Sequence, residues 1–205
     1  MKRQVICQDA LEWLPKHGKN PCIITSLPEM DEMDMNVKEY EVFFRSAARA
    51  CFEAVIDTGY CIFLQTDRKH QGWIDKGYWI TDEGRDLGFH TVWKKIALTK
   101  EVGSADLFRP TYSTMICFTK KGLVGKLFPD VIYTGEKTYS NAFGIESVKL
   151  CIEYAKAQGV KKVLDPFCGS GTTLAVANAY GLDAIGVELS KPFCEQSRKL
   201  KLTIT

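Results

Sequence analysis

Residues 163–174, Val-Leu-Asp-Pro-Phe-Cys-Gly-Ser-Gly-Thr-Thr-Leu, constrain the possible fold more than any other stretch of the chain. An apolar run ends in Asp165, enters a Gly-Ser-Gly turn and continues as a helix-compatible segment. Gly169 and Gly171 can adopt positive φ and let a ligand approach the backbone. The first free N–H groups of the following helix would face that ligand. We therefore expect a strand, a ligand-binding turn and a helix start, since a plain βα turn needs neither the Asp-Pro pair nor two glycines.

Two common ligands of such turns do not match this sequence. A dinucleotide fingerprint requires a third glycine where Leu174 stands, and a P-loop requires a lysine that is missing here. A nucleoside ligand without a pyrophosphate remains. The next expected strand, residues 183–189, ends in Glu188, where an acid usually accepts hydrogen bonds from a ribose diol. A solvated acid at a strand end is the alternative reading of Glu188.

Composition places few further limits on function. A chain of 205 residues is expected to form one domain, and a net charge of +2 lacks the bulk basicity that would by itself indicate nucleic-acid binding. Eight cysteines without a C-x-x-C pair make a zinc site unlikely and suit reduced thiols. No signal peptide or membrane-length apolar run is visible, so we expect an intracellular protein, cytoplasmic or nuclear and not secreted.

The residues of the glycine turn resemble a known family. Asp-Pro-Phe-Cys-Gly-Ser-Gly-Thr-Thr at residues 165–173, followed by Ile-Gly-Val-Glu at 185–188, resembles the S-adenosylmethionine site of amino-methyltransferases that act on exocyclic amines of nucleic-acid bases (N6-adenine or N4-cytosine type). Its place near the C-terminus resembles the circularly permuted, beta-class arrangement, in which the catalytic half comes first. The resemblance implies a single α/β domain of Rossmann-like class I methyltransferase fold, with a mostly parallel seven-stranded sheet and an antiparallel hairpin. Residues 1–137 would form the catalytic half and residues 138–205 the cofactor-binding half.

The same resemblance assigns a cofactor site. The strand expected at residues 4–9 would belong to the cofactor half, with Asp9 accepting a hydrogen bond from the adenine amino group, although Asp9 could equally cap the following turn. Residues 141–143 would lie beside the methionine end, at the start of a helix over residues 140–156 that could also be a plain sheet-covering helix. The residues implied to bind S-adenosylmethionine are Asp9, Thr25, Asn141, Phe143, Asp165, Pro166, Phe167, Gly169, Ser170, Gly171, Thr172, Thr173, Glu188 and Leu189.

The catalytic motif departs from the family pattern. An apolar strand at residues 21–25 leads into Ser26-Leu27-Pro28-Glu29, where the family carries Asp, Asn or Ser, then Pro-Pro and an aromatic residue. In that motif a side-chain oxygen and a backbone carbonyl align the target amine, and the ring stacks on the extruded base. Leu27 loosens a rigid turn, and Glu29 cannot supply a stacking face. The substrate is therefore held differently, the chemistry has changed, or activity has been lost.

The segments around this motif have competing interpretations. Residues 30–36 are acidic and Met-rich and predict a loop over the site or an ordinary solvated loop. Residues 37–55 show the helical spacing of a long amphipathic helix. The next strand, 59–66, leads into a polar segment that is either a phosphate-contacting surface or a solvated helix start. The phosphate reading involves Arg68, Lys69, His70 and Lys76, with Trp73, Tyr78 and Trp79 nearby.

The remaining segments complete the expected sheet. Residues 89–98 and 111–119 predict two strands of an antiparallel hairpin, whose connecting loop would carry Arg109 to the active-site edge. Residues 122–137 have an irregular pattern, and this interval is too short for a separate recognition domain. A last helix is expected from Lys191 through Leu202.

The favoured function is methyl transfer from S-adenosylmethionine to an exocyclic amine of a nucleic-acid base, with no metal needed. Without a recognition domain, structured RNA such as tRNA or rRNA is slightly preferred over DNA as the acceptor. A partner protein that supplies substrate recognition also fits. The alternative function is a cofactor-binding but catalytically silent subunit that scaffolds a partner methyltransferase, and a small-molecule methyltransferase comes third. The sequence leaves open which nucleic acid, base and atom is methylated, and the oligomeric state.

Overall fold

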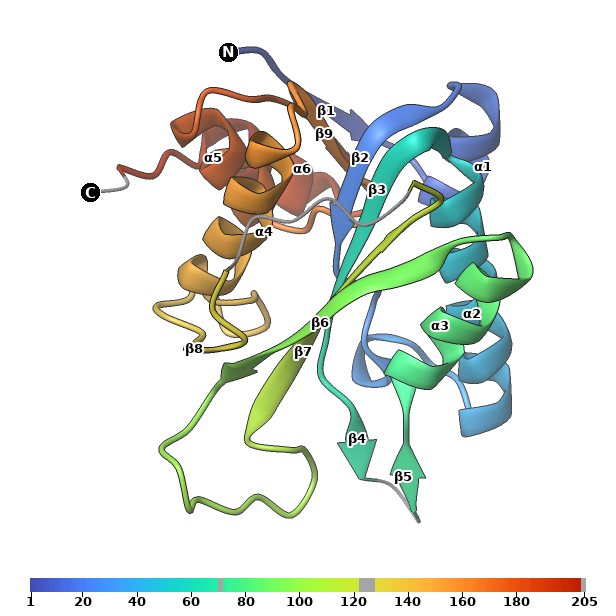
Figure 1. The fold of residues 1–205 in the computed structure, drawn as a ribbon, viewed down its shortest axis with the longest axis vertical. Helices are drawn as coiled ribbons and strands as arrows, with labels where there is room; N and C mark the ends of the chain where they lie inside the picture. Colours follow the sequence, from blue (N-terminus) through green and yellow to red (C-terminus); the bar gives the residue numbers. More distant parts are fainter. Residues whose placement is uncertain (70–71, 122–127, 204–205) are drawn as a thin grey trace.

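The computed structural model describes residues 1–69, 72–121 and 128–203, and in them one large twisted sheet is covered on both faces by helices (Figure 1). The sheet has eight strands in the order β1-β10-β9-β2-β3-β7-β6-β8. Their bounds are β1 Arg3–Cys7, β2 Asn20–Thr25, β3 Val55–Gln65, β6 His90–Leu98, β7 Tyr112–Thr119, β8 Val131–Tyr133, β9 Lys162–Asp165 and β10 Asp183–Glu188. A separate two-stranded ribbon pairs β4 (Arg68–Lys69) with β5 (Trp73–Ile74).

The helices form two layers, one on each face of the sheet (Figure 1). On one face lie α1 (Ala10–Trp13), α2 (Val37–Glu53) and α3 (Lys76–Asp86), whose apolar residues share a core with alternate residues of β2 and β3. On the other face lie α4 (Ile145–Ala157), α5 (Thr172–Ala179) and α6 (Lys191–Lys199). This second core contains the opposite side chains of the same strands, because successive residues of a strand point to opposite faces.

The order of strands shows the permuted connectivity predicted from the sequence. The first strand of the chain, β1, pairs in parallel with β10, and β10 pairs in parallel with β9. The strand β9 then meets β2 through the register pair Ile23 and Leu164. Residues from both ends of the chain therefore build one half of the sheet, as Figure 1 shows by the adjacent blue and orange-red segments.

The predicted hairpin is present, and the sheet has one strand more than the expected seven. Strand β7 runs antiparallel to both of its neighbours, β3 and β6, and every other pairing within the eight-stranded sheet is parallel. The eighth strand, β8, lies in the interval whose pattern looked irregular. Three residues there pair with the free edge of β6, from Ile96 opposite Val131 to Leu98 opposite Tyr133. A strand of three residues is too short to show the alternation of apolar and polar residues by which strands are predicted. Residues 122–127 lie outside the described part of the chain.

Several element boundaries differ from the sequence-based expectation. Helix α4 begins at Ile145 with Gly144 as its N-cap, and not at residue 140 as expected. Residues 138–144 instead form turns that bring Thr138 and Asn141 to the strand edge. The acidic loop contains a short 3₁₀ helix, η2 (Met30–Glu32), and a second one, η1 (Leu14–Lys16), follows α1. Helix α6 ends at Lys199 rather than Leu202.

Within the described residues, no helix has the length and apolar character needed to cross a membrane. The same residues contain no group of three or more His, Cys, Asp or Glu side chains placed to hold a metal ion.

Candidate active site

The predicted site residues gather where the parallel strands end. Strands β1, β2, β9 and β10 run in the same direction, so their carboxyl ends share one edge of the sheet, where open α/β folds bind ligands. One hydrogen bond joins the two halves of the site, because the Thr25 hydroxyl at the end of β2 donates to the Asp165 carboxylate at the end of β9, at 2.7 Å. The turn at residues 26–29 therefore starts beside the glycine turn at 166–171.

Asp165 is the most electrostatically perturbed carboxylate of this edge. Its side chain is 3% exposed, and burial raises its pKa to about 6, even though hydrogen bonds from Thr25, Thr173 and the Phe167 amide oppose the shift. The nearby Glu188 carboxylate adds to the rise. A buried carboxylate without a matching cation favours a positively charged ligand, because such a ligand would offset the cost of its desolvation.

The glycine turn has the backbone geometry that its sequence predicts. Gly169 has φ of +50° and Gly171 has φ of +91°, both in the left-handed region. A Cβ at Gly171 would lie 2.3 Å from the Ser197 hydroxyl oxygen, so this glycine is needed for α6 to pack on the turn. Between the two glycines, the buried Ser170 Oγ has no hydrogen-bond partner in the described chain. An orphaned buried hydroxyl indicates a missing polar ligand or water at this position.

Glu188 is fixed by the turn that it faces. Its Oε2 accepts a hydrogen bond from the Gly169 amide at 2.9 Å, and its Oε1 accepts one from the Ser190 amide at 2.7 Å. A carboxylate has about four lone-pair sites, so acceptor capacity for a diol remains. The Glu188 side chain is half-buried and accepts two backbone hydrogen bonds, so it is not the freely solvated acid of the alternative reading. The following residue, Leu189, is 70% exposed and presents an apolar surface at the same strand end.

The other predicted cofactor residues lie around this edge with varied contacts. Asp9 caps α1 by accepting from the Leu11 amide at 2.7 Å, which confirms its capping role and leaves the adenine role a prediction. Thr172 exchanges a hydrogen bond of 2.5 Å with Thr138. Phe143 packs half-buried against the core of α4 and α5. Pro166 is buried, and Phe167 packs against the core on the α1–α3 face.

In residues 26–29, the motif predicted to be catalytic, the Pro28 and Glu29 carbonyls accept hydrogen bonds from described residues, and the Ser26 and Leu27 carbonyls do not. The Pro28 carbonyl accepts a hydrogen bond from the Tyr40 hydroxyl at 2.9 Å. Among the described residues, none bonds to the Ser26 hydroxyl or to the Leu27 carbonyl. The Leu27 side chain is 1% exposed and belongs to the core beneath the motif. The Ser26 hydroxyl oxygen and the Leu27 carbonyl are therefore among the acceptors of this turn that no described residue occupies.

The fourth motif residue is held in a buried ion pair. The Lys76 ammonium lies 2.7 Å from Glu29 Oε1, with the lysine side chain 1% exposed and the glutamate side chain 16% exposed. Burial lowers the pKa of Lys76, and the adjacent Glu29 charge opposes that shift. Glu29 thus faces Lys76 at the start of α3. The position at which the resemblance implied a stacking ring is occupied here by a charge pair.

This pairing corrects the predicted phosphate-contacting surface. Lys76 is bound to Glu29, Arg68 is ion-paired with Asp31, and Trp79 is buried in the α2–α3 core, so none of the three is available to a phosphate. Trp73 and Tyr78 are exposed as expected, and Lys69 lies over the Trp73 ring at 5.9 Å. His70 lies outside the described residues. The spacing of basic residues gave no indication that acidic residues about forty positions earlier would pair with them.

The acidic loop after the motif is tied to both halves of the site. Asp31 accepts a hydrogen bond from Arg109 at 3.1 Å, which confirms that the loop between β6 and β7 carries Arg109 to the active-site edge. Glu32 accepts from the Asn141 side-chain amide at 3.0 Å and from the Glu29 backbone amide at 3.1 Å. The loop is therefore an ordered segment that bridges the two predicted halves.

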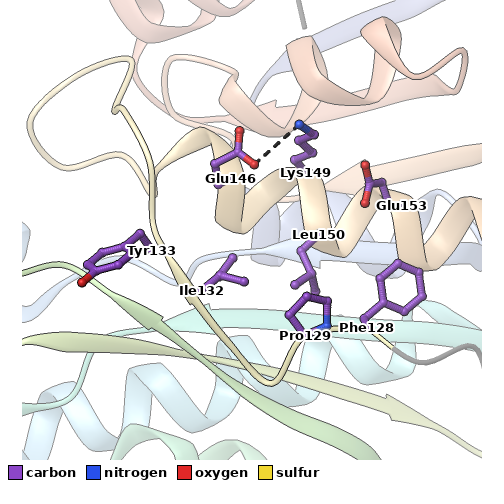
Figure 2. Close-up of a pocket in the computed structure, with 8 residues that line it drawn as sticks. All are labelled: Phe128, Pro129, Ile132, Tyr133, Glu146, Lys149, Leu150 and Glu153. Carbon is purple, nitrogen blue, oxygen red and sulfur yellow. Dashed lines mark ion pairs between the residues drawn. The ribbon is translucent and has the colours of Figure 1, made fainter. Parts of the chain in front are cut away.

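An open groove of about 410 Å³ lies between β8 and α4, away from these residues (Figure 2). Its floor is apolar, and its rim carries Glu153 and the Glu146–Lys149 ion pair of 3.5 Å. None of the predicted site residues lines it, so we place the function at the strand edge.

Sequence reasoning missed three residues of the site. The helical spacing of residues 37–55 predicts that Tyr40 packs in the core, which holds for its ring, but it does not predict the hydrogen bond of its hydroxyl. Lys76 was interpreted as a surface cation. Tyr139 was given no role, although its hydroxyl would lie 2.8 Å from a Cβ at Gly169, and burial raises its pKa to about 12. These contacts form between distant segments, so no local pattern could have revealed them.

The sheet order, the reversed strand and the glycine turn at the carboxyl edge define the class I methyltransferase fold, as predicted. Solved structures with this fold include the PvuII cytosine-N4-specific DNA methyltransferase, at 15% identity and TM-score 0.77, covering 100% of this chain and 89% of that one. A putative DNA modification methylase of Thermus thermophilus, complexed with S-adenosyl-L-methionine, matches at 19% identity and TM-score 0.74, with coverage of 97% and 94%. The M1.HpyAVI complex with S-adenosylmethionine matches at 17% identity and TM-score 0.67, with coverage of 96% and 98%.

The sequence itself also matches a family. Residues 124–199 fit the model of the N6_N4_Mtase family, described as DNA methylase. This segment includes the glycine turn and Glu188, so the resemblance predicted from those residues is confirmed. The match supports an S-adenosylmethionine-dependent enzyme of the nucleic-acid amino-methyltransferase type. The segment does not reach residues 26–29. No curated protein matched the chain.

Proposed function

We propose that this protein transfers a methyl group from S-adenosylmethionine to an exocyclic amine of a nucleic-acid base. The observation that carries the proposal is the Thr25–Asp165 hydrogen bond of 2.7 Å, which joins the end of the motif strand β2 to the glycine-turn strand β9. A methyl donor on the turn and an amine at residues 26–28 would then lie next to each other. Catalysis of this kind depends mainly on positioning.

The residues at the edge suit S-adenosylmethionine, which supplies the methyl group when it is bound. The raised pKa of buried Asp165 favours a cationic ligand, the Ser170 hydroxyl lacks a partner, and Glu188 retains acceptor capacity. We infer that residues 138–205, together with Asp9 and Thr25, form the cofactor side. The exposed Leu189 would contact the adenine ring, and Asn141, Phe143 and Thr172 would flank the methionine end.

On the acceptor side, we infer that the Ser26 hydroxyl and the Leu27 carbonyl accept hydrogen bonds from the target amine. Neither of them accepts a hydrogen bond from a described residue, whereas the Pro28 carbonyl already accepts one from Tyr40. Two acceptors around one amine orient its lone pair in the remaining direction. The motif needs no general base to achieve this alignment.

We propose DNA as the acceptor polymer. Both the family description and the structural neighbours refer to DNA enzymes, and no comparison supports the preference for RNA that the short interval at 122–137 suggested. A partner protein that presents the substrate is also compatible with the short interval at residues 122–137.

A second candidate function is a cofactor-binding subunit without transfer activity. One observation favours it, since the Glu29–Lys76 pair occupies the position expected for a base-stacking ring. Radiolabelled methyl transfer distinguishes the two candidates. The enzyme reading predicts label in DNA that is lost in Ser26→Ala, whereas binding of S-adenosylmethionine with no transfer to DNA or RNA supports the silent subunit. Label in a small molecule alone would contradict both.

A further inference from the structure

The catalytic turn lacks the two residues that would make it rigid by itself. Leu27 has free backbone rotation where a proline would fix φ, and Glu29 lacks the bulk of an aromatic ring. A loose turn would spread the Ser26 and Leu27 acceptors over many orientations and reduce the rate of any reaction that depends on alignment. The structure shows three tertiary contacts at consecutive residues of this turn.

The first two contacts hold Leu27 and Pro28 against α2. The Leu27 side chain is buried in the same core cluster as Tyr40. The Tyr40 hydroxyl then donates to the Pro28 carbonyl at 2.9 Å. Burial raises the pKa of Tyr40, and the neighbouring Glu29 and Glu32 charges raise it further, so the hydroxyl stays a donor.

The third contact holds Glu29 against α3. Lys76 is the first residue of that helix, and its backbone amide donates to Asp67 at 3.0 Å, so its backbone is fixed independently of its side chain. Its ammonium then binds Glu29 Oε1 at 2.7 Å in a site with almost no solvent. The Glu29 amide is held by Glu32 at 3.1 Å.

We propose that Tyr40 and Lys76 are positioning residues that fix residues 26–29 and thereby orient the Ser26 and Leu27 acceptors, a claim that rests on the proposed function. The contacts from α2 and α3 replace the local stiffness that a second proline and a ring would give. Glu29 acts through Lys76 and does not contact the substrate. The altered motif is therefore a rigid turn held by tertiary contacts.

The test compares Lys76→Met, Tyr40→Phe and the double variant Glu29→Gln/Lys76→Met with wild type. Tyr40→Phe removes one hydroxyl and keeps the buried ring, so it is the variant expected to fold in every case. Tyr133→Phe and Lys161→Met are matched controls, because both side chains are exposed and lie outside the motif and the predicted phosphate-contacting surface. The readouts are amide hydrogen exchange over residues 29–33, kcat for methyl transfer to DNA, and the Kd for S-adenosylmethionine.

We expect exchange at residues 29–33 to quicken by about tenfold or more and kcat to fall about 10- to 100-fold in Tyr40→Phe and Lys76→Met, since a misplacement of about 1 Å costs about 100-fold. The Kd for S-adenosylmethionine should stay within about twofold of the wild-type value. In the double variant, amide exchange at residues 29–33 should be slower than in Lys76→Met and closer to the wild-type rate. Unchanged exchange and unchanged kcat in both single variants overturn the proposal. If wild type methylates nothing, the proposed function fails, and the exchange readout alone decides whether Tyr40 and Lys76 fix the turn.

Discussion

Asp165 should make the cofactor-free protein less stable as the pH rises. Its pKa is about 6 in the folded protein against an ordinary value of 3.8, because burial disfavours the charged carboxylate. The folded state therefore holds the proton more tightly than the unfolded state. The stabilisation from the protonated form is complete below about pH 4 and is lost as the pH rises through about 6.

The size of this effect follows from the two pKa values. The full difference corresponds to about 3 kcal/mol, and about 1.4 kcal/mol of it falls between about pH 5 and pH 7.5. Asp165→Asn keeps an oxygen that can accept from Thr25 and removes the titration. We expect the free energy of unfolding of wild type to fall by about that amount relative to Asp165→Asn over this range.

Urea unfolding of the cofactor-free protein at several pH values measures this difference. Asp86→Asn is the control, since Asp86 is exposed and no described residue is paired with it, and its curve should run parallel to that of wild type. Parallel curves for wild type and Asp165→Asn would show that the buried carboxylate is not destabilised. Asp165 would then give the site no preference for a cationic ligand.

Three further predictions concern the turn, the ion pair and the cofactor. Gly171→Ala should lower stability by about 2–4 kcal/mol, from strain at positive φ and a clash with Ser197; a loss below about 1 kcal/mol would contradict this. Lys76→Met should cost about 3–5 kcal/mol and Glu29→Gln/Lys76→Met clearly less in urea unfolding, and equal costs would argue against a buried pair. Glu188→Ala should weaken S-adenosylmethionine binding in calorimetry by about 1.5–3 kcal/mol, and unchanged affinity would refute the ribose assignment.

The local features of the fold could be predicted because each has a local physical cause. The turn with Gly169 and Gly171 at positive φ follows from the residues themselves, and the long α2 follows from its apolar spacing. The pairing of β1 with β10 was predictable only through the family resemblance, since a chain's own pattern does not state which distant strands pair.

The parts that could not be predicted depend on contacts between distant segments. Lys76 has the sequence signature of a surface cation, and only the fold shows that it lies against Glu29. The same holds for the Tyr40 hydroxyl, whose acceptor is on a different element. The start of α4 was placed too early because Ser140 and Asn141 resemble a cap, whereas Asn141 is bound to Glu32.

The central claim is tested most directly by the chemical identity of the product. Unmethylated DNA incubated with the protein and S-adenosylmethionine can be digested to nucleosides and analysed by mass spectrometry, with Ser26→Ala as the control. The account predicts a methyl group on an exocyclic amine, as N6-methyladenine or N4-methylcytosine, that is lost in the control. A methyl group on a ring carbon, or no methylated base although the cofactor binds, would contradict it.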